Sequence, residues 1–131
     1  MPPTPEQDLP TEEQVARFEM LTPMLKSAHD EIRELSNKKP DGMLSKAKVK
    51  WVNQLLGDAR DVLGNDQSVE YLDMLDDEQL PENSDAALLL GRYLAAMTHY
   101  RQCHWRSGEW DTVERREEDK RVRAEMGYET I

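Results

Sequence analysis

The sequence has one cysteine, few aromatic residues and no long uninterrupted apolar run. Cys103 cannot form an internal disulfide, which excludes a disulfide-stapled fold and favours a reducing, cytoplasmic location. The longest apolar stretch, residues 86–97, is broken by Gly91 and Arg92 and is far shorter than the roughly 20 residues of a membrane span. The first eight residues carry neither a basic nor an apolar segment, so we expect no secretory signal and no membrane partner.

Basic residues are also few, since the chain has 17 of them and 27 acidic residues, which gives a net charge of −10. Charge of this sign repels a phosphate backbone, so it disfavours general nucleic-acid binding and favours solubility or a basic partner. β-Branched and aromatic residues are scarce, whereas good helix formers are plentiful. A chain of 131 residues is long enough for one domain. We therefore expect one helical domain.

The spacing of apolar residues predicts three long helices and one short helix, over residues 11–36, 45–63, 68–75 and 83–106. Thr11 and Gln14 have the spacing of a capping box, and Ser45 is placed to cap the second helix. Pro23 predicts either a kink in the first helix or a restart with Thr22 as N-cap. The predicted fold is an all-α, small antiparallel helical bundle.

The two ends of the chain differ in composition from the middle. Residues 1–10 are polar and rich in proline, which predicts a disordered lead-in before a bundle formed by residues 11–106. Residues 107–131 are highly charged and have no apolar stripe, although Asp111 and Glu114 have capping-box spacing. This segment is predicted to be a charged C-terminal helix or tail.

The helix predicted over residues 83–106 is apolar on more than one face. Such a helix is either the central helix of its domain or covers a partner chain with its second face. Small residues form a strip along it that another helix could approach, and two tryptophans flank the Ser107-Gly108 break. Tryptophan is enriched in binding hot spots, although these two could equally cap the bundle. The predicted interaction surface comprises Ala87, Gly91, Ala95, Trp105 and Trp110, facing a second copy or a larger complex.

Charge is unevenly distributed along the chain. Residues 66–85 contain eight acidic residues and no basic residue, without the alternating oxygen ligands and central glycine of a calcium loop. We interpret them as a solvated acidic connector, with a docking surface for basic peptides as an intermediate possibility. Lys46 and Lys50 lie one helical turn apart beside Trp51 and form a candidate basic patch for a nucleic-acid adaptor. The ordinary interpretation of these lysines is a solvated helix face.

Arg92 and His99 are separated by six residues on the last predicted helix. This spacing is similar to the Arg-x(4–6)-His signature of HEPN-type helical ribonucleases. The resemblance implies that His99 would act as the acid/base and Arg92 would stabilise phosphate. Ten arginines and three histidines also make such a spacing common by chance.

A metal site or another catalytic motif is poorly supported. His99 and Cys103 lie one turn apart and His104 follows, but zinc would need further ligands and His29 is the only other histidine. We expect Cys103 to be buried as a small hydrophobic residue, with no metal and no cofactor. No glycine-rich phosphate loop or serine-hydrolase motif is present. The predicted function is therefore a non-catalytic helical interaction protein or accessory subunit, with the RNA-cleaving and adaptor functions as alternatives.

Overall fold

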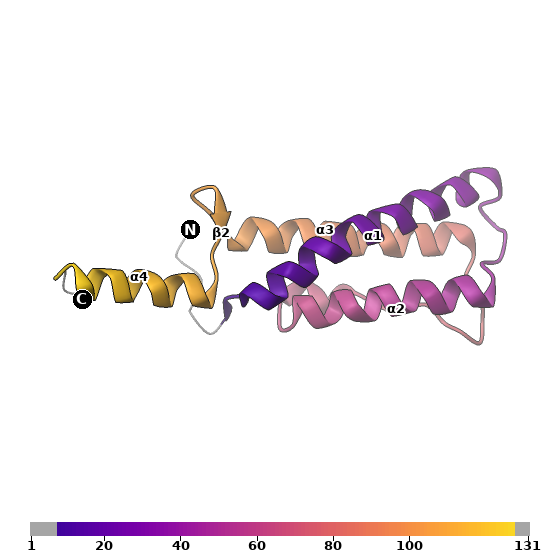
Figure 1. Ribbon diagram of the computed structural model, residues 1–131. Helices are drawn as coiled ribbons and strands as arrows, with labels where there is room; N and C mark the ends of the chain where they lie inside the picture. The colour runs from indigo at the N-terminus through magenta and orange to yellow at the C-terminus, as the bar shows by residue number, and fades with distance from the viewer. Residues whose placement is uncertain (1–7, 128–131) are drawn as a thin grey trace.

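The computed structural model describes residues 8–127, which form a helical bundle with one further helix extending from its end (Figure 1). The long helices are α1 (Glu12–Lys38), α2 (Lys46–Leu63) and α3 (Asn83–His104). A 3-10 helix, η2 (Gln67–Tyr71), follows α2. A two-stranded hairpin, β1 (Trp105–Arg106) and β2 (Glu109–Trp110), leads into α4 (Val113–Glu125). The predicted all-α bundle is confirmed.

The core consists of the apolar faces that the spacing predicted. On α1 the buried residues recur every three or four positions, and α2 and α3 supply the rest. They are Phe18, Leu21, Leu25, Ala28 and Ile32 on α1; Val49, Val52, Leu55, Leu56, Ala59, Val62 and Leu63 on α2; and Ala86, Leu89, Leu90, Tyr93, Ala96, Met97 and Tyr100 on α3. Burial of these side chains supplies the main driving force for folding.

The start of each of the first two helices is fixed by a side-chain cap. The capping box of Thr11 and Gln14 is formed in both directions, and Ser45 accepts a hydrogen bond from the backbone N–H of Lys48. α1 continues through Pro23, so the alternative of a restart is not observed. The Thr22 hydroxyl there donates to the Phe18 carbonyl at 2.8 Å.

α2 and α3 run in the same direction, opposite to α1 (Figure 1). Their first turns lie at one end of the bundle, where Leu44 N–H donates to Pro81 C=O and Asn83 N–H donates to Gly42 C=O. The parallel order requires residues 72–82 of the connector to return along the bundle. In extended form these residues span up to about 36 Å, more than the roughly 27 Å length of α2.

The short helix predicted over residues 68–75 is shorter and tighter than expected. It ends at Tyr71, although Leu72 and Leu75 beyond it are buried as their spacing suggested. Side chains of the bundle bind the backbone there, because Asn53 and Arg60 of α2 hydrogen-bond to Leu75 and Leu72. With these partners the backbone needs no helical hydrogen bonds.

The hairpin after α3 was not predicted. α3 ends at His104, and Ser107 (φ 53°) and Gly108 (φ 83°) occupy the turn between the strands. Positive φ at both central residues is the geometry of a tight two-residue hairpin turn. The Ser107-Gly108 pair therefore reverses the chain and brings Trp105 opposite Trp110.

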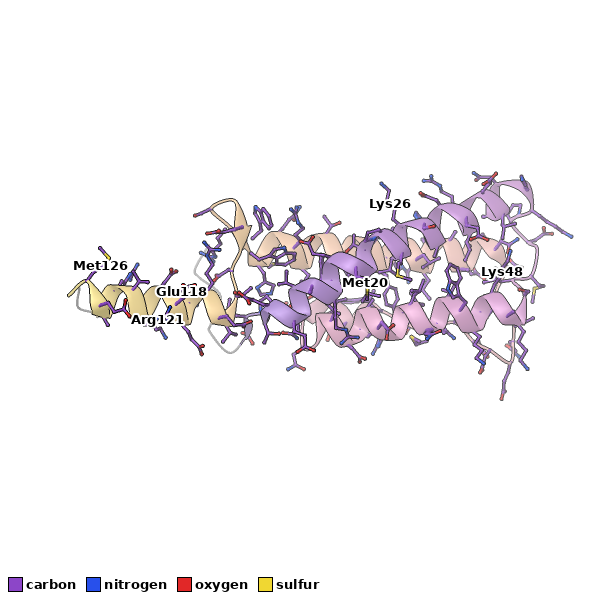
Figure 2. All side chains as sticks on the ribbon, in the orientation of Figure 1. Met20, Lys26, Lys48, Glu118, Arg121 and Met126 are labelled. Carbon is purple, nitrogen blue, oxygen red and sulfur yellow. The ribbon has the colours of Figure 1, made fainter. Side chains whose placement is uncertain are left out.

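The C-terminal extension contains a helix, as expected, but its predicted cap is wrong. Thr112 caps α4 by accepting from Arg115 N–H, whereas Asp111 is buried and its carboxylate binds Arg116. Glu114 instead accepts from Glu12 N–H at 2.6 Å. No residue of α4 is buried, and the helix projects away from the bundle (Figures 1 and 2).

The beginning of the chain is partly described. Residues 1–7 of the predicted lead-in lie outside the described residues. Leu9 and Pro10 are buried, and the Pro10 carbonyl accepts from Val113 N–H at 3.1 Å. Within residues 8–127, no helix combines the length and apolar character needed to cross a membrane.

Candidate functional site

The hairpin places its two tryptophans differently. The Trp110 ring packs edge-to-face on Phe18, with ring centroids 5.0 Å apart, and its indole N–H donates to Glu19 at 2.8 Å. Trp105 contacts Trp110 edge-to-face at 5.9 Å and is half-buried. Trp110 therefore holds the hairpin against α1, whereas Trp105 stands on the outer side of this aromatic cluster.

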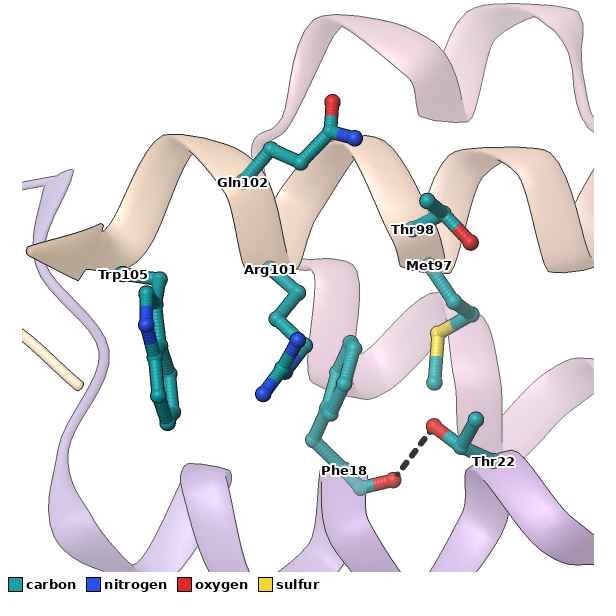
Figure 3. Close-up of a pocket in the computed structure, with 7 residues that line it drawn as sticks. All are labelled: Phe18, Thr22, Met97, Thr98, Arg101, Gln102 and Trp105. Atoms are coloured by element: carbon teal, nitrogen blue, oxygen red, sulfur yellow. Dashed lines mark hydrogen bonds between the residues drawn. The ribbon is translucent and has the colours of Figure 1, made fainter. Parts of the chain in front are cut away.

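A cleft of about 370 Å³ opens between α1 and α3 beside Trp105 (Figure 3). Buried Phe18 and Met97 provide apolar walls, and the Arg101 guanidinium lies 4.2 Å from the centroid of the Trp105 ring. The complete lining is Phe18, Thr22, Met97, Thr98, Arg101, Gln102 and Trp105. Among the described residues Arg101 makes no ion pair with a carboxylate. The cleft can therefore accept an apolar side chain next to an acidic group.

The small-residue strip does not form one continuous exposed surface. Ala87 packs partly against the core, and a Cβ on Gly91 would lie 3.5 Å from His29 Nε2 of α1. Ala95 is exposed and lines a second cleft, about 560 Å³ in volume, rather than the cleft of Trp105. The predicted interaction residues are thus distributed over two sides of α3.

The second cleft lies between α3 and the 3-10 segment. It brings the predicted pair Arg92 and His99 into one concavity, together with Ser68, Tyr71, Leu72, Ala95 and Ala96. His99 Nε2 is 3.5 Å from Cys103 Sγ, as their one-turn spacing suggested. Cys103 is half-exposed rather than buried.

The environment of Cys103 does not favour nucleophilic chemistry. Burial raises the pKa of the Cys103 thiol, and Asp66 raises it further, so the thiolate is disfavoured. Within residues 8–127, no cluster of three or more histidine, cysteine or acidic side chains could hold a metal ion.

A third cavity, about 450 Å³ in volume, lies at the hairpin end of the bundle and was not predicted. His104 lines it and is only 5% exposed, and within residues 8–127 its Nδ1 has no hydrogen-bond partner. Burial lowers the pKa of His104. Burial, with a smaller contribution from the charge of Asp66, raises the pKa of Tyr100 to about 12. Both groups are therefore neutral at physiological pH.

The two lysines of the candidate basic patch lie on an exposed face of α2. Lys46 and Lys50 are exposed, whereas Lys48 between them reaches Glu31 of α1 at 3.9 Å. Trp51 is 41% exposed on the same helix. Figure 2 places Lys48 at the end of the bundle remote from α4. The lysine patch is therefore separate from the cleft of Trp105.

No family model, no curated protein and no solved structure matches this chain.

Proposed function

We propose that the protein is a non-catalytic helical interaction protein, an accessory subunit that binds another protein chain through the cleft beside Trp105. The observation that supports this function is the pairing of Trp105 with Arg101 over an apolar cleft. Tryptophan and arginine dominate binding hot spots, especially around a pocket that excludes water. A bound side chain would remove the exposed part of the Trp105 ring from water.

The lining of the cleft indicates what it binds. Phe18 and Met97 suit an aliphatic or aromatic side chain, and the Arg101 guanidinium suits a carboxylate beside it. Thr98 and Gln102 provide hydrogen-bonding groups at the same site. We therefore expect a protein segment that presents an apolar residue next to an acidic residue.

The experiment is photo-crosslinking in cells from a benzoylphenylalanine at Gln102, an exposed residue of the cleft lining. We expect a discrete crosslinked species that disappears with Trp105→Ala. Trp51→Ala is the matched control, because Trp51 is a partly exposed tryptophan that lies on α2. A crosslink that survives Trp105→Ala would contradict the proposed site.

Sedimentation velocity at micromolar concentration distinguishes the two kinds of partner. Self-association that is weakened by Trp105→Ala would identify a second copy as the partner. A monomer at high concentration would exclude self-association and assign the crosslinked species to a different protein. Gly91→Leu tests whether the strip beside α1 contributes as well.

RNA cleavage remains a second candidate function because Arg92 and His99 line one cleft. The acidic connector beside that cleft opposes the approach of a phosphate backbone. We expect no cleavage of mixed single-stranded RNA by the wild-type protein or by His99→Ala. Cleavage by the wild type that is lost in His99→Ala would overturn the non-catalytic function.

A further inference from the structure

α3 exposes apolar side chains on the face that points away from the core. Leu88 is 59% exposed, and Ala95 is exposed two turns later. With Arg92 and His99 they recur at steps of four, three and four residues, which is one stripe of a helix. The opposite face of α3 is already buried, so Leu88 and Ala95 are apolar residues of this helix that the core does not use.

The connector supplies a wall beside this stripe. Tyr71, which is 71% exposed, and Leu72 line the 560 Å³ cleft opposite Arg92, Ala95 and His99. Leu88 does not line this cleft but lies one turn before Arg92 on the same stripe, and we call the cleft with this extension the outer groove. Its lining is largely apolar, and Ala95 is small enough for another helix to approach closely.

The wall of the outer groove is held in place by hydrogen bonds from the bundle. The Asn53 amide donates to Leu75 C=O and accepts from Leu75 N–H, both at 2.9 Å. Arg60 donates to Leu72 C=O, and the Tyr93 hydroxyl donates to Asp73 C=O at 2.7 Å. A partner therefore meets a formed groove and does not have to order the connector, which reduces the entropic cost of binding.

The charge around the outer groove has one predominant sign. The eight acidic residues of positions 66–85 make no ion pair within residues 8–127. Glu70 and Asp73 flank the wall residues in sequence, and Asp85 lies one turn before Leu88. These carboxylates outnumber the two basic residues of the lining, Arg92 and His99. The groove thus complements an apolar ligand that carries positive charge.

We propose that the outer groove binds a basic amphipathic helix of a partner protein. The apolar face of that helix packs on Leu88, Ala95 and Tyr71, and its lysines or arginines pair with the carboxylates of the connector. A helix is the fitting occupant because Ala95 allows another backbone to approach α3 closely beside an apolar groove, which is the helix-in-groove mode of recognition. This inference goes beyond the proposed function, because the outer groove is a surface separate from the cleft of Trp105.

The test uses three synthetic 20-residue peptides and the full-length protein. The first is an amphipathic helix of leucine and lysine, the second has glutamate in place of lysine, and the third is a scrambled leucine–lysine sequence without an apolar face. By fluorescence anisotropy we expect the first peptide to bind at least about 10-fold more tightly than the other two. Equal binding of the scrambled peptide would show mere charge attraction and would overturn the proposal, as would no binding at all.

Variants locate the site of binding. Leu88→Gln and Tyr71→Ser should each weaken the amphipathic peptide by about 10-fold, because they remove exposed apolar contacts without altering the core. Met20→Gln is the control, since Met20 is 60% exposed on α1. Unchanged affinity in both groove variants, or an equal loss in Met20→Gln, would overturn the proposal.

Neutralising pairs of carboxylates distinguishes the charge beside the outer groove from the general acidity of the protein. Glu70→Gln with Asp73→Asn should weaken binding and reduce its salt dependence, whereas Glu117→Gln with Glu125→Gln on α4 should not. The same outcome for both pairs would overturn the choice of a basic partner. Preferential binding of single-stranded RNA at this groove would do so too.

The two proposals fail independently. Trp105→Ala should retain peptide binding, and Leu88→Gln should retain the crosslink from Gln102. Loss of peptide binding in Trp105→Ala, with the groove variants unaffected, would overturn the outer groove and leave the proposed function intact. A crosslink from Gln102 that no longer depends on Trp105, with peptide binding unchanged, would overturn the proposal for the cleft of Trp105. The proposal for the outer groove would then stand.

Discussion

At the scale of single residues, His104 couples stability to pH. Burial lowers its pKa, which outweighs the opposing influence of Asp66, Asp111 and Asp8, while Arg106 lowers it further. Because the unfolded chain takes up the proton more readily, stability is full above the unfolded pKa of about 6.5 and falls as pH decreases toward the folded pKa. The free energy of unfolding of His104→Leu, measured with urea, should therefore fall less between pH 7.5 and pH 5.5 than that of the wild type.

Exposed His99 provides the control for this experiment. His99→Gln should keep the wild-type dependence of stability on pH over the same interval. An unchanged dependence in His104→Leu would show that the buried imidazole is not responsible.

Two glycines should respond in opposite ways to alanine. A Cβ on Gly42 would lie 2.9 Å from Asn83 Nδ2, the amide that donates to Lys39 C=O, whereas a Cβ on Gly57 in α2 meets nothing within 4 Å. Gly42→Ala should lower the free energy of unfolding by about 1 kcal/mol or more, and Gly57→Ala should raise it by about 0.5–1 kcal/mol. Urea denaturation measures both, and shifts in the same direction would contradict the assigned environments.

At the scale of elements, the connector depends on Asn53. Asn53→Ala removes two hydrogen bonds and leaves the backbone N–H and C=O of Leu75 unpaired. We therefore expect the free energy of unfolding to fall by about 1–3 kcal/mol. Limited proteolysis should cut within residues 72–82 faster in this variant. Gln54→Ala, at the exposed neighbouring position, should behave as the wild type.

α4 and the segment just before it should contribute very differently to stability. Truncation after Arg116 removes only exposed residues of α4, whereas truncation after Trp110 also removes buried Asp111 and Thr112 and the Val113–Pro10 hydrogen bond. We expect the first truncation to leave the thermal midpoint nearly unchanged and the second to lower it by about 4 °C or more. Equal midpoints would support a folded core that ends at residue 106.

The helices were predictable from the sequence because their signals are local. The apolar spacing from Phe18 to Ile32 and the caps at Thr11 and Ser45 each act within a few residues. The extended backbone from Leu72 to Leu75 and the burial of Asp111 were missed because their partners are not helical neighbours: Asn53 lies 22 residues from Leu75, and Arg116 lies five residues from Asp111. For the candidate sites, sequence identified Trp105 and the pair Arg92 and His99, but neither cleft nor the packing of Trp110 on α1.

At the scale of the whole molecule, net charge should make stability sensitive to salt. The formal charge is −10, and the acidic connector is fixed beside the bundle without ion pairs within residues 8–127. Salt screens this repulsion, whereas the exposed ion pairs that it also weakens contribute little. The urea midpoint should therefore rise when NaCl is increased from 0.05 to 0.5 M, because this increase shortens the Debye length about threefold. A lower midpoint would show that the surface ion pairs dominate.

The contact between the beginning of α1 and the beginning of α4 has a consequence for the order of folding. Glu12 N–H binds Glu114, 102 residues later in the chain, and Trp110 closes over Phe18 and Glu19. Contacts of such sequence separation carry a large loop-closure cost, so the helices can pair before this seam forms. On the ribosome, the first turns of α1 therefore remain uncovered by Trp110 and α4 until almost the whole chain has been synthesised.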